Sequence, residues 1–176
     1  MDNTRDVQTR VKHKILKSYL DAWAGIIVSG LSGAAAKCAS RGLPFRAGLV
    51  YVDGFSWCGQ YDGDASEVVL SGSAPSPKWG SPIIGIQALD DAKRFATSRG
   101  VKLETMTILV EEHADEFRSL QESLKLAGFG TRTAIDSAPL KLTDGQVAAI
   151  QGDFLGQAEP DRLSHPGAIP EGILPP

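Results

Sequence analysis

The feature that most constrains the fold is an alternation of apolar runs with helix-forming segments between residues 45 and 155. The apolar runs are 47–52 (AGLVYV), 103–110 (LETMTILV) and 146–150 (QVAAI). They are short and rich in β-branched residues, as strands of a buried parallel sheet are. Strands separated by helices in this order predict an α/β fold with a parallel, Rossmann-like sheet.

Two helices are predicted between these strands. Ser81 is placed to cap the first helix and Pro82 to occupy its first turn, and Gly100 ends it. The second covers residues 114–127 and ends at Gly128. A long glycine-bearing loop, residues 53–81, precedes the first helix, and loops of this length in compact domains are usually functional or disordered.

Helical structure is also predicted for the N-terminal segment, residues 1–44. Apolar residues recur at helical spacing in VKHKILKSYLDAW, residues 11–23, with lysines on the other side, so an amphipathic helix is expected. A second helix, rich in small residues, is predicted over 26–40. The run AWAGIIVSGLSGAAA lacks the ~20 strongly apolar residues of a membrane span, and no signal peptide precedes it. We therefore expect a soluble, cytoplasmic protein with no membrane partner.

Composition favours one domain. The 176 residues are 42% apolar, which suffices for one ordinary core. We expect an N-terminal helical segment at 1–44, an incomplete Rossmann-like domain at 45–155 and a proline-rich irregular tail at 156–176. Cys38 and Cys58 lie far apart in the sequence and form no metal-spaced pair, so neither a disulfide framework nor a structural zinc site is expected.

Charge is unevenly distributed. Residues 1–46 carry eight Lys/Arg and three Asp/Glu, although the whole chain has a net charge of -3. This basic N-terminal region could meet a polyanion such as nucleic acid, or it could be the solvated face of a helix. The histidines have no spacing typical of a metal site, and His13, beside Lys12 and Lys14, is expected at the surface.

Acidic residues follow each predicted strand. The strand ends hold Asp53 with Gly54, Phe55 and Gly59, then Glu111, and finally Asp153. In parallel sheets ligands bind at the carboxyl ends of the strands, where an acid commonly accepts hydrogen bonds from ribose hydroxyls. Glu111 suits this role, or it is a solvated acid at the start of a helix. Trp57 in the first loop could stack on a base or anchor the loop.

Five ordered segments resemble one family. They are TRVKHKILKSYLDAW, DGFSWCGQY, GSPIIGI at 80–86, ILVEEHADEFRSL at 108–120 and VAAIQGDF at 147–154. Together they span residues 9–155 and look like the three-Cys-motif partner protein family, TcmP. That family is similar to class I methyltransferases, which use S-adenosylmethionine (SAM).

The resemblance implies a set of cofactor-binding residues. Asp53, Gly54, Phe55 and Gly59 would form the first cofactor motif, at the methionine end of SAM. Glu111 would bind the ribose and Asp153 would face the adenine amine, while the amides of Gly80 and Ser81 would line the same pocket. A three-Cys-motif protein would be the partner, and no metal site is implied.

The sequence departs from the family at two places. Ser56 and Trp57 stand where the family has Ala-Gly, which puts a large ring where a ligand would need close approach. The family's D-P-x-G-like catalytic motif, after a fourth strand, has no match, so no catalytic residue is assigned and the chain looks truncated after the third strand. We expect an exposed sheet edge at the third strand. Two functions stay open: a SAM-binding protein that is inactive alone, or a non-catalytic module that binds protein or nucleic acid through its basic helices.

Overall fold

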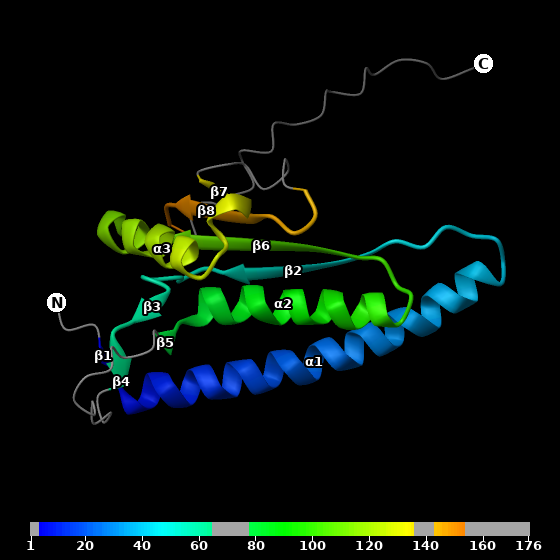
Figure 1. Cartoon of the computed structure of the whole chain (residues 1–176), viewed down its shortest axis with the longest axis horizontal. Helices are drawn as coiled ribbons and strands as arrows, with labels where there is room; N and C mark the ends of the chain where they lie inside the picture. The colour runs from blue at the N-terminus through cyan, green and yellow to red at the C-terminus, as the bar shows by residue number, and fades with distance from the viewer. Residues whose placement is uncertain (1–3, 65–77, 136–142, 154–176) are drawn as a thin grey trace, which may run out of the picture.

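The computed structural model describes residues 4–64, 78–135 and 143–153, which form an α/β fold around a four-stranded parallel sheet (Figure 1). In chain order the elements are β1 (Thr4–Arg5), α1 (Val7–Ala39), β2 (Ala47–Asp53), β3 (Gln60–Tyr61), β4 (Gly63–Asp64), β5 (Lys78–Trp79), α2 (Ser81–Ser98), β6 (Leu103–Glu111), α3 (Ala114–Leu126), the 3₁₀ turn η1 (Gly130–Arg132), β7 (Thr133–Ile135) and β8 (Val147–Gln151). The sheet is compatible with a partial Rossmann-like fold, as the sequence predicts.

The strand order is β2-β6-β8-β7, and every pair is parallel. The three predicted strands are confirmed as β2, β6 and β8. The expected exposed edge at the third strand is wrong, because β7 pairs with β8 through Thr133↔Val147 to Ile135↔Ala149. Among the described strands, β2 and β7 each have one hydrogen-bonded neighbour and form the two edges of this sheet.

Three layers follow one another in Figure 1: α1, then α2, then the sheet. Both crossover helices, α2 and α3, pack in one apolar cluster with β6 and β8, so they cover the same face of the sheet. This arrangement is what two successive crossovers of the same, right-handed sense produce.

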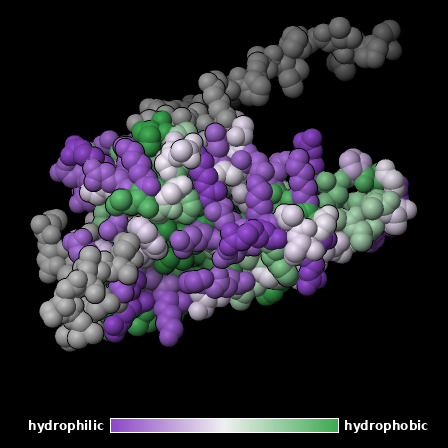
Figure 2. Space-filling view, viewed as in Figure 1, coloured by the Kyte–Doolittle hydropathy of each residue, from purple (hydrophilic) through white to green (hydrophobic). Residues whose placement is uncertain are grey.

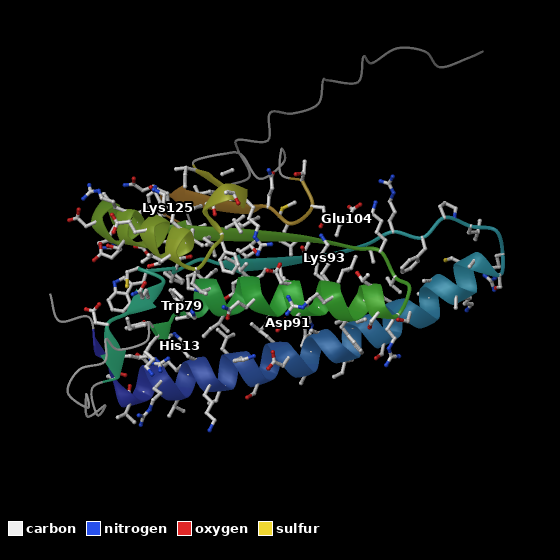
Figure 3. All side chains as sticks on the ribbon, in the orientation of Figure 1. His13, Trp79, Asp91, Lys93, Glu104 and Lys125 are labelled. Carbon is white, nitrogen blue, oxygen red and sulfur yellow. The ribbon has the colours of Figure 1, made fainter. Side chains whose placement is uncertain are left out.

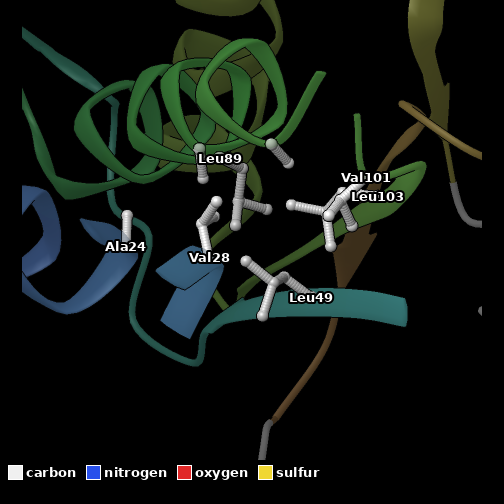
Figure 4. Packing of buried hydrophobic residues seen from close by; sticks show 8 residues of the cluster. Ala24, Val28, Leu49, Leu89, Val101 and Leu103 are labelled. Carbon is white, nitrogen blue, oxygen red and sulfur yellow. The ribbon is translucent and has the colours of Figure 1, made fainter. Parts of the chain in front are cut away.

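Two apolar clusters hold these layers together. The first joins Ala24 and Val28 of α1 to Leu49 of β2 and Leu89 of α2, with Val101 and Leu103 beside them (Figure 4). The second joins the crossover helices to the sheet and contains Ile83, Leu109, Leu120, Leu124 and Val147. Full burial of one such side chain contributes roughly 1.5–3 kcal/mol, so these clusters are the main source of stability.

The N-terminal segment folds as one helix of 33 residues, so the two predicted helices are wrong. Asp6 caps it by accepting a hydrogen bond from the Thr9 amide at 2.6 Å. Gly25 and Gly30 lie within it, where an added Cβ would meet nothing within 4 Å. Packing along α2 outweighs the ~1 kcal/mol helix penalty of each glycine.

By length and composition alone α1 could cross a membrane, contrary to the expectation from its apolar run. Core helices of soluble proteins and N-terminal signal sequences meet the same criterion, and 11% of the apolar window is buried in this fold. Here Leu20, Ala24 and Val28 are buried in the fold, and lysines occupy the N-terminal half of the helix.

Candidate functional site

The strand-end acids lie at one edge of the sheet. Asp53 is the last residue of β2 and Glu111 the last of β6, and Gln151, the last residue of β8, pairs with Glu111. Asp153 follows β8 by two residues and is exposed. Because the strands are parallel, all three acids are at the carboxyl edge, which is where the sequence pattern predicts a ligand site.

Glu111 is buried, with 8% of its surface exposed, and both carboxylate oxygens accept backbone hydrogen bonds. Oε2 accepts a hydrogen bond from the Trp57 amide at 2.7 Å, and Oε1 accepts one from the His113 amide at 3.0 Å. Glu111 therefore holds the loop after β2 against the start of α3. A ribose diol would have to replace at least the Trp57 amide to reach this carboxylate.

Asp53 organises the start of the same loop. Its Oδ1 accepts the Phe55 amide at 3.2 Å, and its Oδ2 lies 3.3 Å from the Tyr51 hydroxyl. The same hydroxyl lies 3.3 Å from the Ser81 carbonyl, so its single proton serves one of two acceptors. Burial, followed by the nearby Asp53 charge, raises the pKa of Tyr51, which keeps it a neutral donor.

Tyr51 belongs to the candidate site as well, although the sequence pattern did not single it out. Residues i and i+2 of a strand share a face, so Tyr51 and Asp53 could have been paired from the pattern alone. The ring packs on Gly85 of α2, where an added Cβ would lie 2.1 Å from Tyr51 Cε1. Gly85 is therefore required for this packing.

The loop between the two acids adopts glycine-type backbone angles. Trp57 has φ +46° and Gly59 has φ +71°. A left-handed conformation is unfavourable for a residue with a side chain. This chain adopts it at Trp57, the position where the TcmP-like pattern has glycine. Trp57 therefore adopts a backbone conformation that glycine adopts more readily.

The end of this loop packs tightly against both crossover helices. A Cβ on Gly59 would lie 2.9 Å from Leu120 Cδ1, and Ser123 Oγ donates to the Cys58 carbonyl at 2.7 Å. The Gly80 amide donates to the Gly59 carbonyl at 2.9 Å. Gly80, not the predicted Ser81, is the N-cap of α2, and Ser81 is the first helical residue. No side chain caps this helix start.

An aromatic chain leads from the loop to α1. The rings of Trp57 and Tyr61 are 5.1 Å apart and those of Tyr61 and His13 are 5.6 Å apart. Figure 3 shows His13 on the side of α1 that faces β5. The expected surface position of His13 is therefore wrong: it is half-buried, and its Nδ1 is buried with no hydrogen-bond partner in the described part of the chain.

Titration of these rings is shifted by their surroundings. Burial, and then the charge of Arg5, lowers the pKa of His13, while Asp53 opposes this effect. Burial raises the pKa of Tyr61 to about 12. Both rings are therefore neutral near pH 7. Nothing in the sequence signalled their contact, because His13 and Tyr61 come together only through the packing of α1.

Within residues 4–64, 78–135 and 143–153, no group of three or more His, Cys, Asp or Glu is arranged to hold a metal. Cys58 is buried and Cys38 half-buried, and neither forms a disulfide within the described part of the chain. The chemistry available at this edge is thus that of carboxylates, backbone amides and aromatic rings.

Comparison with known proteins gives little further information. No protein-family model matches the chain, and no solved structure matches it. An error-prone DNA polymerase of Rhodopseudomonas palustris is 30% identical over 112 residues, which cover 61% of this chain. The chain spans 9% of the length of that polymerase.

Proposed function

We propose that this protein is a SAM-binding, methyltransferase-like protein of the three-Cys-motif partner type, with its cofactor site at the carboxyl edge of β2, β6 and β8. The observation that carries the proposal is the pair of acids, Asp53 and Glu111, that end neighbouring parallel strands and hold a left-handed loop between them. This is where parallel α/β folds bind nucleosides.

The residues would fit the cofactor if the loop opened at Trp57. The Glu111 carboxylate already accepts two hydrogen bonds, as a ribose diol would require, but the Trp57 amide occupies one oxygen. Release of that amide would leave Oε2 for a hydroxyl. Asp153 is exposed beyond β8, at the position that the resemblance assigns to the adenine amine.

Bound SAM would supply an electrophilic methyl group. The chain's own residues would orient it: Glu111 through the ribose, and the backbone of the Asp53–Gly59 loop and the uncapped start of α2 near the methionine end. The sequence has no match to the family's catalytic motif, so the proposal covers binding and assigns no catalytic residue. A three-Cys-motif protein remains the proposed partner class.

Isothermal calorimetry with SAM and with its demethylated product tests the proposal. We expect saturable binding, and Glu111→Ala should weaken it at least tenfold, about 1.4 kcal/mol. Glu112→Ala is the matched control, because Glu112 is the exposed neighbour and should leave affinity unchanged. No heat at millimolar ligand with a folded protein would refute the proposal.

A second candidate is a non-catalytic interaction module. It is favoured by the engagement of both Glu111 oxygens within the fold and by two exposed valines on edge strand β2, Val50 and Val52, which are 53% and 46% exposed. The same calorimetry separates the two functions, since an interaction module requires no heat with SAM.

A further inference from the structure

A basic groove lies along the N-terminal half of α1. Its volume is about 430 Å³, and Arg5, Arg10, His13, Lys14, Lys17 and Asp21 line most of it. The lining holds four Lys/Arg and one acid, Asp21, which forms an ion pair with Lys17 at 2.9 Å. Figure 2 shows hydrophilic side chains along this half of α1 and paler, more apolar ones toward its C-terminal end.

The cations of the groove form a short row. Arg10, Lys14 and Lys17 are spaced by four and three residues, which puts them on one stripe of the helix, with Asp21 one turn beyond. At 1.5 Å per residue the three cations span roughly 10 Å. A row of cations of this length suits a chain of phosphates better than a single small anion.

Aromatic groups adjoin the same groove. His13 lines it and contacts Tyr61, which contacts Trp57 in the loop at the sheet edge. In that loop the side chains of Phe55 and Trp57 are exposed, by 81% and 40%.

A ligand that matches both features must carry several phosphates and unpaired planar rings. Proteins that bind single strands combine a positive groove for the backbone with aromatic side chains on which bases stack. We propose that this surface binds single-stranded nucleic acid, with phosphates along Arg10, Lys14 and Lys17 and a base stacked on Phe55. The idea that single-stranded nucleic acid is the substrate at the cofactor site rests on the proposed function. The binding of nucleic acid itself requires no cofactor.

Fluorescence anisotropy with labelled single-stranded DNA and RNA, without SAM, tests the inference. Three phosphate contacts predict a slope of log K against log salt of about -2, so affinity should fall about 20-fold from about 50 to about 200 mM salt. Arg10→Gln with Lys14→Gln should flatten the slope to about -0.7 and weaken binding about 25-fold at about 0.1 M salt.

The matched control is Lys12→Gln with Lys37→Gln, which removes two charges from α1 outside the groove. Equal losses in the two double variants would show that only net charge matters and would overturn the inference. Phe55→Ala should weaken binding at least fivefold, whereas Tyr19→Ala, an exposed ring on α1 outside the groove, should not. Equal or tighter binding of a duplex would also overturn it.

Folding of each variant is checked by its helical circular dichroism. Ultraviolet cross-linking of the wild-type complex gives a result that needs no variant, and adducts should map to residues 55–61. Adducts confined to other parts of the chain would contradict the placement. Failure of SAM calorimetry leaves these measurements unaffected, so the two proposals fail separately.

Discussion

Glu111→Gln is the substitution that most directly tests how the site is built. Glutamine has nearly the size of glutamate but keeps one acceptor oxygen and replaces the other with an amide group. One of the amides of Trp57 and His113 would then face a donor in a buried setting. The substitution also removes the negative charge of the carboxylate. That charge strengthens the hydrogen bonds from both amides, so they become weaker.

The expected cost follows from these contacts. A hydrogen bond to a charged group contributes about 1.5–3 kcal/mol, and a buried donor left without an acceptor costs a similar amount. We expect Glu111→Gln to lower the free energy of unfolding by about 2 kcal/mol. With a urea dependence of about 2 kcal/mol per molar, the midpoint should fall by about 1 M.

Urea unfolding monitored by tryptophan fluorescence measures this change, and Glu112→Gln is its control. Glu112 is exposed, so its substitution should change stability by no more than about 0.5 kcal/mol. Hydrogen exchange adds a local measurement, because the Trp57 amide should lose protection in Glu111→Gln. A midpoint equal to that of the control, with Trp57 still protected, would refute the role of Glu111 in holding the loop.

Two other predictions concern packing and pH. Gly85→Ala should destabilise the protein by roughly 1–3 kcal/mol, because the new Cβ would overlap the Tyr51 ring. Gly30→Ala, in open space on α1, should stabilise it by about 0.5–1 kcal/mol. Thermal unfolding of the two variants and the wild type measures both changes. The pKa of His13 is lowered in the fold, so the unfolded state binds more protons below about pH 6.5 and stability should fall as the pH drops from there toward the folded pKa. His13→Gln should reduce that slope in urea unfolding at several pH values, and an unchanged slope would contradict a buried neutral His13.

The strands and crossover helices were predictable because each buries an apolar face that the sequence pattern displays. β2, β6 and β8 lie within one or two residues of the apolar runs at 47–52, 103–110 and 146–150. β7 was missed because three residues, Thr133–Ile135, are too few to show a period. The break predicted near Gly25 was wrong because local propensity is weak compared with packing along a whole helix.

The positions of the strand-end acids were predictable from the sequence, but their contacts were not. Parallel strands bring their terminal acids to one edge, so the placement of Asp53 and Glu111 follows from topology. The hydrogen bond from Trp57 to Glu111 joins residues 54 positions apart and depends on a left-handed backbone at Trp57. No local pattern encodes such a contact, and the same holds for the ring contact of His13 with Tyr61.

Under the proposed function Glu111 would have two uses that exclude each other, because the oxygen that accepts a hydrogen bond from the Trp57 amide is the one that a ribose hydroxyl would need. If closing the loop with this bond is favourable by about 2 kcal/mol, the open form is populated at a few per cent. A ligand that requires the open form then binds about 30-fold more weakly than its contacts alone would allow. If a nucleic-acid base stacked on Phe55 favoured the open form of this loop, binding in the basic groove would raise the affinity of the chain for the proposed cofactor.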